Sequence, residues 1–183
     1  MNSDYTAAGI FSLAMSVYNM FSPIAQYRIY TYQVSDVNRK YSMGNYLALR
    51  ILTSIITLVG IILYSALTIN AATAITITLY SIFKLSGLLI DILHGENQLQ
   101  HRMDLTGISY FIQGMLFLIA FIVVYQFSNS LNLALIIMTV STIAAGALFD
   151  LKATARFQRI TIEFDKKAIT SLLVECAPAV IAG

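Results

Sequence analysis

Lys84 is the residue whose position points most clearly to chemistry, because it lies inside a long apolar run. Between residues 73 and 93 the only charged residues are Lys84 and Asp91. On an ideal helix, with about 100° per residue, one narrow face carries Thr73, Thr76, Tyr80, Lys84, Gly87 and Asp91. A lysine at membrane depth costs about 3 kcal/mol unless it meets water or a partner. We therefore expect a water-filled cavity that can receive an anion, with pairing of Lys84 to Asp91 or another acid as the alternative.

A second polar face lies in the first apolar stretch. Its members are Ser12, Ser16, Asn19, Pro23, Gln26 and Tyr30. We expect Pro23 to kink this helix, and Asn19 and Gln26 to extend the cavity lining. Arg28 lies off this face on a straight helix and would then reach the headgroups. Beyond a kink it would turn into the cavity, where a guanidinium suits phosphate. Arg50 has the same two alternatives, of which the headgroup position is favoured.

Other polar residues give weaker signals. Tyr110 and Gln113 either extend the lining or, as we favour, make ordinary interhelical hydrogen bonds. Thr139, Thr142 and Gly146 form a pattern of small residues that favours helix packing. His94, Glu96 and His101 are expected in a loop after the third span, without metal-ligand spacing. With no glycine-rich phosphate loop and no Ser/His/Asp set, we expect neither an enzyme nor a bound metal or cofactor.

The elements that position these residues are long apolar segments. The chain has 183 residues, of which 58% are hydrophobic and 11% charged, whereas soluble domains have roughly 25% charged residues. About 20 apolar residues cross a bilayer as a helix. Five segments fit, at about 7–30, 47–67, 73–93, 106–125 and 131–149. They do not alternate between apolar and polar residues, which argues against a barrel. The sequence predicts an all-α, polytopic bundle.

Beyond this bundle, taken as residues 1–149, the chain continues with a basic segment and a short apolar one. Residues 150–167 are expected to form a cytoplasmic connector, and residues 168–183 the truncated start of a further transmembrane helix.

The distribution of basic residues predicts the orientation of the spans. Lys and Arg residues favour cytoplasmic loops, and they follow the first, third and fifth spans but not the second and fourth. We therefore expect the N-terminus outside. Because no signal sequence precedes it, we expect an upstream helix to be missing and the chain to be a piece of a longer protein or a truncated gene product.

Four stretches carry a family resemblance: QYRIYTYQVSDV, NYLALRILTSIITLVG, YSIFKLSGLLIDILHGENQLQHRMDLTGIS and FDLKATARF. Together they resemble the Wzx-type polysaccharide flippases of bacteria, in the multidrug/oligosaccharidyl-lipid/polysaccharide exporter superfamily. The resemblance implies two six-helix lobes around a cavity, of which this chain would hold helices two to six and the start of the seventh. It implies flipping of undecaprenyl-diphosphate-linked sugar repeats in the plasma membrane, for O-antigen or other surface polysaccharide. It also implies that Lys84 and Arg28 hold the diphosphate and that Asp91 couples to a cation or proton.

Two alternatives stay open. A drug/cation antiporter of the same superfamily would need acidic cavity residues, and this chain offers mainly Asp91. A membrane scaffold or assembly subunit would need no transport site. For the flippase interpretation the expected partners are a lipid-linked oligosaccharide, membrane lipids and the missing second lobe or a partner chain, and not nucleic acid.

Overall fold

The computed structural model describes the backbone of residues 2–181 and the side chains of residues 6–178 and 180. Over these residues the chain forms helices and no strand. The helices are α1 (Asn2–Gln26), α2 (Ile29–Ser35), α3 (Met43–Thr68), α4 (Ala71–Leu99), α5 (Met103–Ser128), α6 (Leu131–Ala145), the π-helical turn η1 (Gly146–Asp150), α7 (Leu151–Thr154) and α8 (Lys166–Ile181). Segments long and apolar enough to cross a membrane are Thr6–Ser35, Met43–Thr68, Ala71–Leu99, Met103–Ser128 and Leu131–Thr154. The predicted polytopic helical bundle is confirmed.

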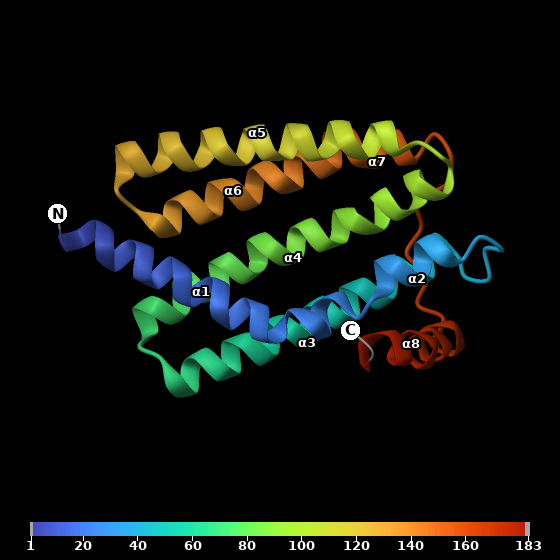
Figure 1. Cartoon of the computed structure of the whole chain (residues 1–183), viewed down its shortest axis with the longest axis horizontal. Helices are drawn as coiled ribbons and strands as arrows, with labels where there is room; N and C mark the ends of the chain where they lie inside the picture. Colours follow the sequence, from blue (N-terminus) through green and yellow to red (C-terminus); the bar gives the residue numbers. More distant parts are fainter. Residues whose placement is uncertain (1, 182–183) are drawn as a thin grey trace.

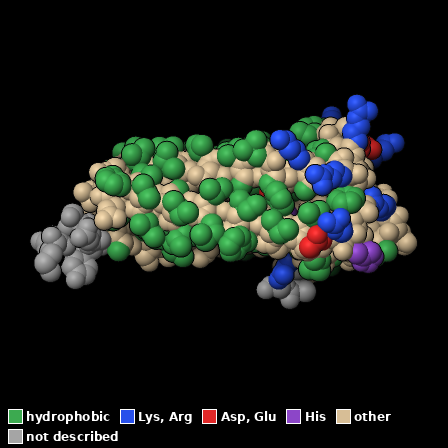
Figure 2. All heavy atoms as spheres, turned by 90° about the horizontal axis from the view of Figure 1, so that it is seen from above, with side chains coloured by type: hydrophobic (Ala, Val, Ile, Leu, Met, Phe, Trp, Pro, Cys, Tyr) green, Lys and Arg blue, Asp and Glu red, His purple; other side chains and the backbone are tan. Residues whose placement is uncertain are grey.

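Helix α4 lies at the centre of the bundle. In Figure 1 it runs between the α5–α6 pair on one side and α1 with α3 on the other, and it contacts all four. At one end of the bundle only residues 69–70 and 129–130 connect the long helices. The other end carries the longer connections, residues 36–42, 100–102 and 155–165. The face drawn in Figure 2 is covered with hydrophobic side chains, and its Lys and Arg side chains gather toward the end with the longer connections.

Three of the long helices begin at a residue whose side chain caps the helix N-terminus. Ser42 accepts a hydrogen bond from the Asn45 N–H before α3, and Asn70 accepts one from the Thr73 N–H before α4. Ser130 caps α6 in the same way. Such caps satisfy N–H groups that have no intrahelical acceptor, and each contributes about 1 kcal/mol. The many Thr, Ile and Tyr residues nevertheless form helices, because a helix satisfies its backbone groups internally in hydrocarbon.

Two helices extend beyond their predicted ends. Helix α4 continues to Leu99, so His94 and Glu96 are buried helical residues and not loop residues as predicted. Past residue 149 the chain stays helical through η1 and α7, and Asp150 is fully buried. Apolar content falls at these positions, which is why the sequence suggested that the spans end there. The polar side chains continue the helices because they find partners inside the bundle.

The first span breaks after Gln26 and not at Pro23. Pro23 has no N–H for the carbonyl of Asn19, and the Ser22 hydroxyl donates to that oxygen instead, at 3.0 Å. The helix therefore passes through Pro23. Tyr27 and Arg28 then adopt left-handed conformations, with φ of 41° and 51°, before α2 begins. The prediction of a kink at Pro23 is therefore wrong, and the chain changes direction at Tyr27 and Arg28 instead. The break leaves carbonyl groups at the end of α1 without intrahelical donors.

Arg50 supplies donors to the end of α1. Its guanidinium Nη1 lies 2.8 Å from the carbonyl oxygens of both Ala25 and Gln26. Thr53 Oγ1 donates to the Ala25 oxygen at 3.1 Å. Arg50 is 1% exposed, so the expected headgroup position is wrong. A guanidinium fits here because Nη1 carries two N–H donors, one for each carbonyl.

Helix α8 folds back onto α2 and the start of α3. Its Glu175 carboxylate accepts hydrogen bonds from Lys40 Nζ at 2.6 Å, from the Tyr41 hydroxyl at 2.9 Å and from the Tyr32 hydroxyl. The Lys40 and tyrosine hydrogen bonds lower the pKa of Glu175 to about 2. Beside it, Cys176 is fully buried, and burial raises the pKa of its thiol to about 11.

Replacing Arg50 by Met is expected to lower the free energy of unfolding by about 3 kcal/mol, because one buried and one half-buried carbonyl group lose a charged donor. Thr53→Val removes one neutral hydrogen bond to the same carbonyl and should cost about 1 kcal/mol. Helix content followed during unfolding in mixed micelles measures both. The control is Arg102→Gln, because Arg102 pairs with Asp104 on the surface and such pairs contribute less than about 1 kcal/mol. Equal stability of the Arg50 and Arg102 variants would contradict this role.

Glu175→Gln is expected to expose Cys176 by loosening α8, so that a pyridyl disulfide reagent reacts with the thiol several-fold faster at neutral pH. Because the pKa of Glu175 is lowered in the folded chain, its ionised form stabilises α8 docking above its ordinary value of 4.5. That contribution is lost as pH falls from there toward about 2. Wild-type reactivity should therefore rise over this interval, while the variant shows no such rise. Asp104→Asn is the control, and an unchanged rate in Glu175→Gln would argue against the contact.

Candidate functional site

A cavity of about 630 Å³ lies over the middle of α4, between α1 and α5. Its lining residues are Met15, Tyr18, Asn19 and Gln26 from α1, Tyr80, Phe83, Lys84, Gly87, Leu88 and Asp91 from α4, Tyr110, Gln113, Gly114 and Phe117 from α5, and Thr142 from α6. Ligand sites in proteins commonly measure about 300–1,000 Å³ and combine apolar walls with a few polar groups. The cavity has both the size and the mixed lining of such a site.

Lys84 lines this cavity near the middle of α4, and its side chain is exposed. Its Nζ lies 5.9 Å from the ring centre of Tyr80 and 5.8 Å from that of Phe83. Within the described part of the chain it makes no ion pair. The alternative pairing with Asp91 is therefore not formed, since two helical turns of about 5.4 Å each separate the two residues. Among the described residues its contacts are the faces of two aromatic rings, so the ammonium group can accept an anion.

Arg28 lines a smaller pocket of about 180 Å³ next to the large cavity. The two share Gln26, Leu88, Asp91 and Tyr110, so they are parts of one polar region. The left-handed residues after α1 place Arg28 there, although it would lie off the polar face of a straight helix. Asp91 thus lies between a pocket with Lys84 and a pocket with Arg28.

Most of the predicted lining residues meet in this region, and two do not. Asn19, Gln26, Tyr80, Gly87 and Asp91 line the cavity. Thr73 and Thr76 lie buried nearer the start of α4, outside its lining. Thr76 Oγ1 instead donates to Asn132 Oδ1 at 2.6 Å. The polar face of α4 therefore divides into a packing part and a cavity part.

Tyr110 combines the two alternatives drawn for it, whereas Gln113 lines the cavity but makes its hydrogen bond within α5. Both residues line the cavity. The Tyr110 hydroxyl donates a hydrogen bond to Asp91 Oδ1 of α4 at 3.2 Å, and Gln113 Nε2 donates one to Ser109 Oγ of α5 at 2.8 Å.

Gly146 belongs to the small-residue pattern that predicts helix packing. It lies against Ile90, and a Cβ atom at this position would come within 2.8 Å of the Ile90 side chain.

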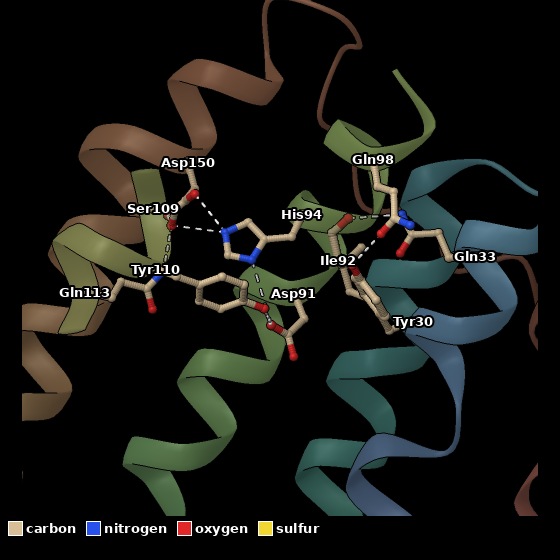
Figure 3. A network of polar contacts seen from close by, with 10 residues as sticks. All are labelled: Tyr30, Gln33, Asp91, Ile92, His94, Gln98, Ser109, Tyr110, Gln113 and Asp150. Carbon is tan, nitrogen blue, oxygen red and sulfur yellow. Dashed lines mark hydrogen bonds and ion pairs between the residues drawn. The ribbon is translucent and has the colours of Figure 1, made fainter. Parts of the chain in front are cut away.

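A buried polar network behind the cavity was not predicted. Figure 3 shows His94 between Asp91 on one side and Ser109 with Asp150 on the other. His94 Nε2 lies 3.0 Å from Ser109 Oγ and 3.0 Å from Asp150 Oδ1. The Ser109 hydroxyl donates to Asp150 Oδ2 at 2.9 Å. The π-helical turn η1 supplies Asp150, and such turns often occur at functional sites.

The hydrogen-bond network indicates that Nε2 of His94 carries a proton. The Ser109 hydroxyl already donates to Asp150, so the favourable partner for both oxygens is an N–H on Nε2 of His94. The other ring nitrogen, Nδ1, is buried without a hydrogen bond. It lies 3.9 Å from Asp91 Oδ1. Asp91 therefore connects the cavity to the buried network.

Sequence spacing gave only a partial signal for this network. Asp91 and His94 are three residues apart, which places them on the same side of a helix, but Asp150 is distant in sequence and is oriented by a π-helical turn. In the part of the chain that the structure describes, no three His, Cys, Asp or Glu side chains are arranged to hold a metal ion. The network is one of hydrogen bonds and proton-binding groups.

Comparison with known proteins gives one informative likeness. Over 128 residues the chain is 30% identical to the capsular polysaccharide biosynthesis protein CapF of Staphylococcus aureus. The matched region covers 70% of this chain and 32% of that relative, so the chain spans about a third of the relative's length. No protein-family model and no solved structure matches the chain.

A cysteine at position 87 tests whether the cavity holds water. A Cβ atom at Gly87 would meet nothing within 4 Å, so Gly87→Cys is expected to fold. In a Cys176→Ser background, its thiol should react with a sulfonate-bearing methanethiosulfonate at least about tenfold faster than Ile55→Cys, because hydrocarbon excludes the charged reagent. Ile55 is exposed on α3 outside both pockets, within about one helical turn of the same depth. Equal rates would show that position 87 faces no aqueous space.

Proposed function

We propose that this chain is part of a membrane protein that moves polyprenyl-diphosphate-linked oligosaccharides across the bacterial plasma membrane. The likeness to a capsular polysaccharide biosynthesis protein supports a role in making surface polysaccharide. The polytopic bundle supports the translocation step, because most other steps of such a route are group transfers. Neither the sequence nor the described residues offer a recognisable group-transfer motif.

The observation that carries the proposal is an ammonium group without an acid partner in the middle of an apolar bundle. Lys84 lies in a cavity large enough for a headgroup and has no ion pair among the described residues. An uncompensated charge at this depth is costly, so the position favours a role in which an anion arrives. A diphosphate is such an anion, and in this proposal Arg28, which lines the smaller pocket, contacts its second phosphoryl group.

The cavity lining also suits the rest of the ligand. Tyr18 and Tyr80 offer aromatic surface with hydroxyl groups, and Asn19, Gln26 and Gln113 offer hydrogen bonds for sugar hydroxyls. In this proposal the polyprenyl tail stays in the surrounding lipid. The remainder of a longer protein would form the opposite wall, and rocking of the two halves would expose the cavity to each side in turn. The basic end of the bundle faces the cytoplasm in this proposal, in keeping with the usual distribution of Lys and Arg.

A cation antiporter is the second candidate, and one observation favours it. Asp91 lines the cavity and is 28% exposed, so an organic cation could pair with it. Lys84 in the same cavity opposes this function by charge repulsion. The effects of neutralising Lys84 and Asp91 therefore separate the two candidates.

Lys84→Ala at the native gene is expected to reduce surface polysaccharide at least about tenfold. Loss of a charged contact to phosphate costs about 2 kcal/mol, or roughly thirtyfold in binding. Lipid-linked repeat units should accumulate on the cytoplasmic leaflet, while the amount of protein in the membrane is unchanged. Immunoblots and leaflet-selective labelling of the glycolipid measure these quantities.

Lys152→Ala is the matched control, because Lys152 is exposed at the basic end and lines neither pocket. It should leave export unchanged. Normal surface polysaccharide in Lys84→Ala would overturn the proposed function. Unchanged polysaccharide together with loss of cation efflux in Asp91→Asn would instead favour the antiporter.

A further inference from the structure

A groove of about 310 Å³ lies between α3, α4 and the segment formed by α6, η1 and α7. It shares no lining residue with the cavity of Lys84 or the pocket of Arg28. Its lining residues are Leu47, Ser86, Leu89, Ile90, Leu93, Ile143, Gly146, Ala147 and Leu151. Ser86 is the one polar side chain in this lining, and its hydroxyl already donates to the Phe83 carbonyl oxygen at 2.7 Å. The occupant that fits this apolar groove is therefore a hydrocarbon.

Small residues of η1 produce the groove and leave it open to the outside of the bundle. Gly146 is buried against Ile90, and a Cβ atom there would come within 2.8 Å of the Ile90 side chain. Next to it Ala147 is exposed and contributes only a methyl group. Ile143 and Leu151, which line the groove before and after these two residues, are also exposed. In a spanning segment, such an opening faces lipid chains.

The groove lies toward the basic end of the bundle, where the longer connections are. Ser86 and Leu93 of its lining are seven residues apart on α4, or about 10 Å along the helix axis. Leu47 and Leu151 line it near the ends of α3 and α7 at this basic end. An apolar cavity of ~150 Å³ holds a benzene ring, so a groove of about 310 Å³ accommodates a segment of one acyl chain.

Two cations without acid partners follow the groove in the chain. Lys152 comes directly after Leu151, and Arg156 comes four residues later. Both side chains are exposed, and neither makes an ion pair within the residues that the structure describes. A lipid whose chain lies beside Leu151 has its phosphate at this end of the bundle. Basic residues at a membrane surface attract anionic phospholipids in preference to zwitterionic ones.

Asn97 adds an unfilled hydrogen-bond position at the same end. It lies four residues after Leu93 and therefore on the same side of α4. Its Oδ1 accepts a hydrogen bond from Thr154 Oγ1 of α7 at 3.1 Å, whereas its Nδ2 is buried without an acceptor. Buried donors without an acceptor are unfavourable, and the ester and phosphate oxygens of a phospholipid are acceptors. The groove thus combines apolar walls with cations and an unpaired donor at one end.

We propose that the apolar groove binds one acyl chain of an anionic phospholipid from the leaflet at the basic end, and that Lys152 and Arg156 contact its phosphate. The bound chain fills the space beside Gly146 and Ala147 and supports η1 against α4. The site is separate from the polar cavity, so this inference does not depend on the proposed function.

Quenching of tryptophan fluorescence by brominated lipids tests the site, because the chain contains no tryptophan of its own. Ile143→Trp places a reporter at the groove, and Ile55→Trp places one on the exposed face of α3 outside it. Each whole chain is reconstituted in phosphatidylcholine with increasing amounts of dibrominated phosphatidylglycerol or, as the matched quencher, dibrominated phosphatidylcholine. At position 143 phosphatidylglycerol should bind at least about fivefold more tightly than phosphatidylcholine. At position 55 the two lipids should quench equally.

Two further changes in the Ile143→Trp background assign the preference to the groove and to the cations. Ala147→Phe fills the groove and should abolish the preference, whereas Leu148→Phe, on the exposed surface next to it, should not. Lys152→Gln combined with Arg156→Gln should leave the quenching but make the two lipids equal.

Equal quenching by the two lipids at position 143 would overturn the inference. Relief of the quenching by an added polyprenyl phosphate would also overturn it, because the groove would then belong to the transported ligand. Native mass spectrometry of the unsubstituted chain, released from nanodiscs of both lipids, gives an answer that needs no variant. One retained phosphatidylglycerol is expected, and retention of neither lipid or of both equally would contradict the site.

Discussion

A buried carbonyl group in an apolar bundle is costly without a hydrogen-bond donor, and this cost decides the arrangement at the end of α1 beside the cavity. Hydrocarbon offers no water to a free carbonyl, so the break after α1 is possible only because Arg50 and Thr53 reach its last carbonyl groups. The break in turn directs Arg28 toward Asp91. Lys84 differs from Arg50, because among the described residues its ammonium group contacts aromatic rings and pairs with no acid. We infer that its partner is the ligand.

The spans could be predicted from the sequence because length and continuous hydrophobicity are local properties. The cavity face of α4 was predictable for the same reason: a period of 3.6 residues places Tyr80, Lys84, Gly87 and Asp91 together without knowledge of any neighbour. Thr73 and Thr76 share that face, but both lie outside the cavity lining, and the hydrogen-bond partner of Thr76 comes from α6. Periodicity therefore identified the face and not the point at which the cavity ends.

The remaining features depend on contacts between distant segments. Arg50 has the same local pattern as an arginine that reaches the headgroups, and only the carbonyl groups of α1 explain its burial. His94 and Asp150 lie where hydrophobicity falls, so a sequence pattern places them outside the spans. Their partners come from α5 and η1, and a π-helical turn changes the direction of side chains in a way that an ideal helix does not show.

The central claim is that the cavity around Lys84 receives a polyprenyl diphosphate, and photo-crosslinking tests it most directly. A diazirine placed next to the diphosphate of a short polyprenyl probe would be activated on the whole chain in nanodiscs, and the labelled peptides identified by mass spectrometry. The account predicts labelling of the cavity faces of α1, α4 and α5 that inorganic diphosphate suppresses and that the matching uncharged polyprenol does not reproduce. Labelling confined to the exposed faces of α3 and α6, equal for both probes, would contradict it.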